Sequence, residues 1–180
     1  MSFPSSPLFS SLFNCDDSNL CFPVHSSSVH FLRSPDHFYN TLLRSFMTAY
    51  QLVRSYAEAE FGPAGGKFMR THRFRLSMPP IDEKKWGTSL ASAAYIGMVA
   101  LLTGRAVRAD WCVTGALDSD GEVNEVAGIP QKVAAAVQNE MQWIVMPQAN
   151  DRAFQRIETH LRPIQAHFAR NVTDLLAMLI

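Results

Sequence analysis

The sequence lacks an excess of charge of either sign, a long apolar run and an even set of cysteines. Its 16 basic and 16 acidic residues give a net charge of +0, so nothing in its charge indicates a nucleic-acid or anionic-membrane partner. The longest apolar stretch, residues 91–104, is too short and too rich in Ala, Ser and Gly to span a bilayer. Three cysteines are an odd number, so free thiols are expected rather than a disulfide framework.

The N-terminus also lacks the features of a targeting signal. Residues 1–17 carry neither a basic segment nor a continuous apolar segment, which argues against a secretory signal. No arginine precedes Arg33, which argues against a transit peptide, so a cytoplasmic protein is expected. Residues 1–8, rich in Ser and Pro, are expected to form a flexible tail, and residues 9–180 a single domain.

Histidine and cysteine occur near the N-terminus, but not at the spacing of a metal site. Cys15, Cys21, His25 and His30 do not form the CxxC and HxxxH pairs that are typical of zinc ligands. We therefore expect no metal and no cofactor, and we interpret these residues as small apolar and solvent-facing side chains on short strands.

Helical periodicity and alternation along the chain predict a mixed α/β domain. Ser34, Pro35 and Asp36 form a helix start, and apolar residues at helical spacing continue to about residue 60, where FGPAGG is expected to end the helix. The last helix is expected to be capped near Thr173. The other predicted elements are strands at 11–13, 20–24, 29–33, 73–79, 143–147 and 164–168 with a turn at 25–28, a hairpin joining 111–117 to 122–126, and helices at 89–102, at 130–140 and from about 150.

One lysine lies in surroundings that do not suit its charge. Lysine is scarce in this chain, and Lys132 falls within VAGIPQKVAAAV, residues 126–137, which is otherwise almost wholly apolar. A buried ammonium is unfavourable by several kcal/mol unless it is paired or loses its proton. A lysine that is neutral near pH 7 can accept a proton, and beside a serine hydroxyl it makes that serine a nucleophile.

Ser89 is the candidate partner, because it lies at a predicted loop-to-helix junction. Backbone N–H groups and the helix dipole at such a junction can stabilise a developing oxyanion. Each residue alone also has an ordinary interpretation. Lys132 could extend its ammonium to water from a helix, and Ser89 could simply cap the helix that follows it.

The order and spacing of four short motifs resemble those of the proteolytic domain of the Lon-type ATP-dependent proteases. WGTSLA (86–91) lies where that family has its nucleophile, LLTGRAVRAD (101–110) at the end of the following helix, VTGA (113–116) on the next strand and AGIPQK (127–132) at the lysine motif. Ser89 and Lys132 are 43 residues apart, as in the family. WIVMPQAND (143–151) also resembles a later family motif. The resemblance covers roughly residues 10–180.

This resemblance implies a Lon proteolytic-domain-like α/β fold and a Ser/Lys catalytic dyad of Ser89 and Lys132. It further implies that the Thr114 hydroxyl is placed to bond the lysine, and that the loop of Trp86, Gly87 and Thr88 contributes to the oxyanion or substrate site. The implied activity is that of a serine endopeptidase cleaving flexible or unfolded polypeptides or a polyprotein. The sequence contains no GxxxxGK[ST] motif, so ATP-independent cleavage is expected. Family domains form rings, which implies a homo-oligomer.

The chain departs from the family pattern at several positions around the dyad. Trp86 replaces an aspartate, Thr88 a proline, Ala91 and Ala127 glycines and Ala116 a glutamate. A catalytically weak or inactive Lon-like domain that serves assembly is therefore the alternative function. Retention of both dyad residues favours the enzyme over that alternative, and the order of the motifs disfavours an unrelated small-molecule hydrolase.

Overall fold

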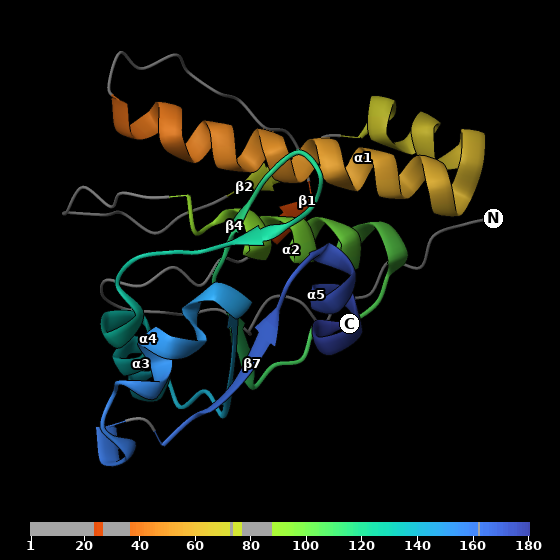
Figure 1. Ribbon diagram of the computed structural model, residues 1–180. Helices are drawn as coiled ribbons and strands as arrows, with labels where there is room; N and C mark the ends of the chain where they lie inside the picture. Colours follow the sequence, from red (N-terminus) through yellow and green to blue (C-terminus); the bar gives the residue numbers. More distant parts are fainter. Residues whose placement is uncertain (1–23, 27–36, 73, 77–87, 162) are drawn as a thin grey trace.

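The computed structural model describes residues 24–26, 37–72, 74–76, 88–161 and 163–180, which form an α/β arrangement of helices around a parallel sheet (Figure 1). The elements in chain order are β1 (Val24–Ser26), α1 (His37–Thr71), β2 (Phe74–Leu76), α2 (Ala91–Thr103), β3 (Trp111–Val113), β4 (Ala116–Leu117), β5 (Val123–Asn124), α3 (Ile129–Gln138), β6 (Trp143–Pro147), the 3₁₀ helix η2 (Gln148–Asn150), α4 (Asp151–Gln155), the 3₁₀ helix η3 (Thr159–Leu161), β7 (Gln165–Ala169) and α5 (Val172–Leu179). The predicted tail of residues 1–8 and the predicted helix start at Ser34–Asp36 lie outside the described residues.

The central sheet has the strand order β3-β6-β7, and both neighbouring pairs are parallel. Side chains alternate between the two faces of a strand, so consecutive residues of β6 belong to different apolar cores. Val145 packs with residues of α1, α2 and α5, whereas Ile144 and Met146 pack with residues of α3 and α4. The sheet is therefore covered on both faces, as is usual for parallel strands. In the described part of the chain, no helix is both long and apolar enough to cross a membrane.

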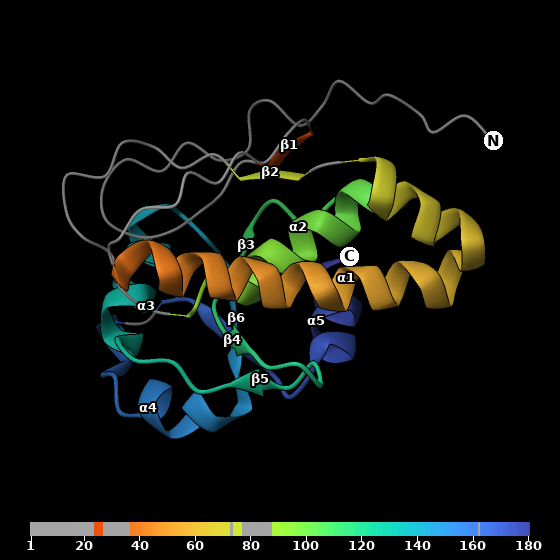
Figure 2. The ribbon, with the colours of Figure 1, turned by 90° about the horizontal axis from the view of Figure 1, so that it is seen from above.

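Helix α1 doubles back on itself, which the sequence does not predict. The first helical segment ends at Gly62 (φ 53°, ψ −138°), close to the predicted end near residue 60, but the chain then forms a second helical segment to Thr71. Glycine adopts this positive φ without the steric penalty of a side chain, and Pro63 suits the first position of the next helical segment. The Tyr50 hydroxyl donates to the carbonyl of Met69 at 3.0 Å and joins the two segments. Figure 2 shows the long segment crossing over α2.

The predicted hairpin of 111–117 with 122–126 is only partly correct. Residues 116–117 pair with 123–124 in antiparallel fashion, but Trp111–Val113 pair with β6 in the parallel sheet. The chain leaves that sheet after Thr114, whose N–H donates to Val145 O at 2.9 Å. Residues 111–117, which the sequence predicts to be one strand, are therefore divided between two sheets by the long-range pairing with β6.

The short N-terminal sheet also differs from expectation. Residues 25 and 26, which were assigned to a turn, belong to β1, and β1 pairs with β2 so that His25 lies opposite Arg75. The turn propensity of residues 25–28 reports only local preferences, so it cannot predict pairing with a strand about 50 residues later. Cys15, Cys21 and His30 lie outside the described residues. Among those that the structure does describe, no group of three or more His, Cys, Asp or Glu side chains could hold a metal.

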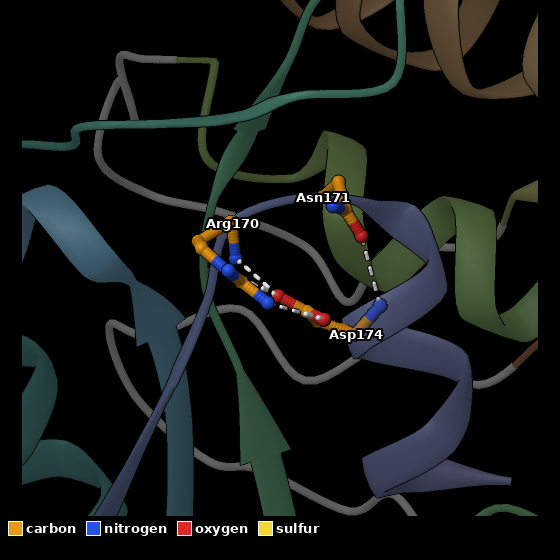
Figure 3. Close-up of polar contacts among 3 residues, drawn as sticks. All are labelled: Arg170, Asn171 and Asp174. Atoms are coloured by element: carbon orange, nitrogen blue, oxygen red, sulfur yellow. Dashed lines mark hydrogen bonds and ion pairs between the residues drawn. The ribbon is translucent and has the colours of Figure 1, made fainter.

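The last helix is capped at Asn171, one residue before it begins and two residues before Thr173, near which the cap was expected. Asn171 has extended backbone angles, and its side-chain oxygen accepts a hydrogen bond from the Asp174 N–H at 3.0 Å. Arg170 Nε contacts Asp174 Oδ2 at 3.1 Å, so both residues before α5 bond to its first turn (Figure 3). Asparagine is among the best helix caps, and it fixes the start of α5 at Val172. The predicted strands at 11–13 and 29–33 lie outside the described residues, as do residues 20–23, 73 and 77–79 of two other predicted strands. The remaining predicted elements, including the end of α2 at Gly104 (φ 67°), are confirmed within a few residues.

Candidate active site

Ser89 lies in a turn directly before α2, with its side chain half-buried. The N-cap position of α2 is Leu90, and no side chain makes a capping hydrogen bond there. The Ser89 hydroxyl is therefore not the cap of this helix, which was its ordinary interpretation. It lies instead beside the N-terminal end of a 13-residue helix, which is the positive end of the helix dipole. The N–H groups of Ala91 and Ser92 there are already bonded, to Thr88 O and Gly115 O respectively.

Gly115 fixes the backbone around Ser89 from the neighbouring strand segment. The Gly115 N–H donates to Ser89 O at 3.3 Å, and Gly115 O accepts from the Ser92 N–H at 3.2 Å. The fully buried Ser92 hydroxyl donates to the same carbonyl at 3.0 Å. A Cβ at position 115 would lie 2.6 Å from Ser92 Oγ and 2.7 Å from Val123 Cγ1. Position 115 therefore accepts only glycine unless Ser92 or Val123 is displaced.

Lys132 reaches Ser89 from the first turn of α3. Its Nζ donates to Ser89 Oγ at 3.3 Å across 43 residues of sequence. This is slightly longer than most N–H···O hydrogen bonds. The lysine side chain is half-buried, and burial lowers the pKa of its amine below the ordinary value. Within the described residues it forms no salt bridge with a carboxylate.

The backbone leading into α3 is fixed by a residue that the sequence does not single out. Asn150 is only 1% exposed, and its side chain accepts from Val126 N at 3.0 Å and donates to Val126 O at 2.9 Å. Gly128 then turns the chain at a left-handed φ of 74° into the helix that carries Lys132. The one sequence signal for Asn150 is its place in WIVMPQAND, the stretch that resembles a family motif.

The structure gives different outcomes for the other predicted site residues. Thr114 is buried, 7% exposed, at the end of β3 and next to Gly115. No hydrogen bond joins its side chain to Lys132 among the contacts of the described residues, so its supporting role stays a prediction. Thr88 is exposed, and its carbonyl accepts from Ala91 N at 3.2 Å. Trp86 and Gly87 lie outside the described residues.

These contacts place an amine with a lowered pKa against a serine hydroxyl. A lysine that loses its proton more easily than usual can accept the hydroxyl proton as the oxygen attacks an electrophile. The serine also lies at the positive end of the α2 dipole, which can stabilise the negative charge that such an attack develops. The arrangement is therefore suited to acyl transfer.

Comparison with known proteins places this chain beside one protease family. Residues 36–180 match the Lon protease (S16) C-terminal proteolytic domain. The Lon protease of Finegoldia magna is 30% identical over 138 residues, which are 76% of this chain and 18% of that protein. The Lon protease of Methylocella silvestris is 34% identical over 118 residues, 66% of this chain and 14% of that protein.

A mitochondrial relative extends the comparison beyond bacteria. The Lon protease homolog of Drosophila melanogaster is 28% identical over 109 residues, which are 60% of this chain and 11% of that protein. The chain thus spans less than a fifth of the length of each of these three relatives. Because the family match covers four fifths of its residues, the chain belongs to the family of Lon protease C-terminal proteolytic domains.

Proposed function

We propose that this chain is a serine endopeptidase in which Ser89 is the nucleophile and Lys132 is the general base. The observation that carries the proposal is the 3.3 Å contact from Lys132 Nζ to Ser89 Oγ. The lowered pKa of Lys132 supports it, because a base must be partly unprotonated at the working pH. A lysine that only extended to water would not need a serine hydroxyl as its partner.

The proposed reaction is a two-step acyl transfer. Lys132 takes the Ser89 proton while the oxygen attacks the carbonyl carbon of a peptide bond, and the protonated lysine then gives that proton to the leaving amine. Water next attacks the acyl-serine ester, loses a proton to Lys132, and releases the acid product with regeneration of the Ser89 hydroxyl. One residue thus serves as base and as acid in both steps.

Backbone groups before α2 are the proposed oxyanion donors. The tetrahedral intermediate carries its charge on the former carbonyl oxygen, and donors fixed in advance stabilise it most effectively. Gly115 and Ser92 hold the Ser89 turn through their hydrogen bonds, so a donor on this turn keeps its place during the reaction. We propose that the loop of Trp86, Gly87 and Thr88 completes this site.

The proposed substrates are flexible or unfolded polypeptide segments, including those of a polyprotein. An extended backbone can add its hydrogen bonds to a strand edge, which favours chains that are not already folded. We propose that cleavage by this chain needs no ATP, because its sequence contains no phosphate-binding GxxxxGK[ST] motif.

The test is cleavage of a fluorogenic peptide and of casein by wild type, Ser89→Ala and Ser119→Ala, each with and without ATP and magnesium. Ser119 is an exposed serine in the turn between β4 and β5, and its replacement controls for loss of a hydroxyl. We expect Ser89→Ala to lose roughly 10³-fold or more of the activity and to remain folded, since Ser89 caps no helix. Equal cleavage by wild type and Ser89→Ala would reject the nucleophile, and no cleavage by any variant would favour an assembly role.

A further inference from the structure

We infer that Asn150 is a positioning residue for Lys132, acting through the backbone of Val126 to set where α3 begins. Its catalytic consequence rests on the proposed function, but its effect on the lysine does not. Asn150 lies in η2, directly after β6, and touches neither dyad residue in any hydrogen bond of the described chain. Its influence must therefore pass through the segment that it binds.

The contact with Val126 uses both polar atoms of the Asn150 side chain. The oxygen accepts from Val126 N at 3.0 Å and the nitrogen donates to Val126 O at 2.9 Å. An amide that bonds the donor and the acceptor of one residue fixes both the distance and the rotation of that residue. Asn150 is 1% exposed and Val126 is 8% exposed, so water does not compete for these groups.

Only a short and conformationally defined segment separates this contact from the lysine. Gly128 follows Val126 by two residues, adopts a φ of 74° and forms the N-cap of α3. The Gly128 carbonyl accepts from the Lys132 N–H at 3.0 Å, so the backbone of Lys132 is bonded directly to the N-cap residue. A shift of the Val126 backbone would therefore move the first turn of α3, and Lys132 with it.

Apolar packing alone would not define this position. The buried face of α3 consists of Ile129, Val133, Ala135 and Ala136, and hydrophobic contacts are non-directional. They keep the helix on the sheet but permit small shifts along its axis. The reach of Lys132 to Ser89 is sensitive to such shifts, since a displacement of about 1 Å can lower a rate by roughly 10²-fold.

Asn139 provides a matched control at the other end of the same helix. Its side-chain nitrogen donates to Ala135 O at 2.9 Å, and its backbone N–H bonds the same carbonyl at 3.0 Å. Loss of the Asn139 side chain therefore also removes an amide bond that holds α3. That bond lies at the C-terminal end, away from the turn that carries Lys132.

The experiment compares Asn150→Ala, Asn139→Ala and wild type by kcat, KM and the pKa of Lys132. The pKa is read by NMR of lysine labelled with ¹⁵N at Nζ, because the chain has only Lys67, Lys84, Lys85 and Lys132, and Lys132→Met assigns the signal. For Asn150→Ala we expect kcat to fall by roughly 10²-fold with KM within about threefold. We also expect the Lys132 pKa to rise toward about 10.4. Asn139→Ala should change neither kcat nor this pKa.

An Asn150→Ala chain that is folded by circular dichroism and keeps the wild-type kcat and Lys132 pKa would overturn the inference. If wild type shows no Ser89-dependent cleavage, the proposed function fails, and the pKa comparison still decides the role of Asn150. Should Asn150→Ala not fold, Asn150→Asp replaces it. Its carboxyl is ionised at pH 9 and then cannot donate to Val126 O, so kcat at pH 9 should fall well below that of wild type. A kcat equal to that of wild type at pH 9 would overturn the inference.

Discussion

The two halves of the candidate site are held in different ways. On the serine side, Gly115 bonds Ser89 and Ser92 through its own backbone, and the approach is too close for any side chain at position 115. On the lysine side, α3 packs through apolar side chains, and the amide of Asn150 supplies the directional contact with the chain before it. The serine is thus placed by backbone contact, and the lysine by a long side chain on a helix.

Because of this difference, substitutions on the two sides should affect stability and cleavage in different ways. The serine side combines close packing with buried hydrogen bonds, so changes there should affect stability and cleavage together. The lysine side places a partly desolvated amine in a position where an apolar side chain would suit the fold better. Changes there should therefore remove activity and leave stability unchanged or improved, the trade-off expected of a functional site.

The largest effect is expected for Lys132→Met, which has similar length but no charge. Cleavage should fall by roughly 10³-fold or more, because the base is lost. The variant should also melt at a higher temperature than wild type at pH 7, since burial of the amine no longer opposes folding. Peptide cleavage and thermal melts of both proteins measure these two outcomes.

The pH dependence of that stability difference identifies its cause. The pKa of Lys132 is lowered in the folded state, so the unfolded chain binds more protons between the folded value and about 10.4. Wild type therefore gains stability as pH rises through this window, and the advantage of Lys132→Met should shrink between pH 7 and pH 10. Lys67→Met, at an exposed position on α1, is the control and should show no such trend. A Lys132→Met chain that melts lower at both pH values would mean that a charged lysine stabilises the fold.

On the serine side, Gly115→Ala should reduce both stability and cleavage. The new Cβ would meet Ser92 Oγ and Val123 Cγ1, and such overpacking usually destabilises by about 1–3 kcal/mol. Displacement of the Ser89 turn should lower kcat by up to about 10²-fold. Gly66→Ala in the second segment of α1 is the control, since a helix-interior glycine to alanine change commonly stabilises by about 0.5–1 kcal/mol. Urea unfolding and cleavage that leave Gly115→Ala equal to wild type would show that the contact is not restrictive.

The smallest effect is expected at Thr114, the residue between β3 and Gly115. Thr114→Val keeps the shape of this buried residue and removes its hydroxyl. If that hydroxyl orients the Lys132 amine during turnover, kcat should fall about tenfold with little change in KM or melting temperature. Steady-state kinetics decide the question. Unchanged kcat would make Thr114 an ordinary strand residue.

The sequence predicts the local elements of the fold better than their connections. Gly104 ends α2 as expected, because a left-handed glycine is a strong local stop signal. The end of the first helical segment at Gly62 is also a local signal, but the packing of a second segment back onto it, with Met69 bonded to Tyr50, is not. The division of the hairpin after Thr114 depends on a distant partner, Val145. Periodicity alone therefore misses the second segment of α1 and makes one hairpin too long.

The contact within the candidate site could be predicted because motif spacing carries long-range information. Ser89 and Lys132 are 43 residues apart in sequence and meet at 3.3 Å. The positioning role of Asn150 could not be predicted from its residue type. An asparagine shortly after a proline usually indicates a turn. Its role becomes visible only when its two bonds to Val126 are seen.

The central claim is that Ser89 is a nucleophile activated by Lys132, and covalent trapping tests it most directly. A peptidyl phosphonate ester should transfer its phosphonyl group to the nucleophilic serine, and tandem mass spectrometry locates the adduct. The account predicts one adduct per chain, on Ser89, that forms more slowly in mild acid as Lys132 is protonated and at least about 10²-fold more slowly in Lys132→Met. An adduct on another residue, or equal labelling of wild type and Lys132→Met, would contradict it.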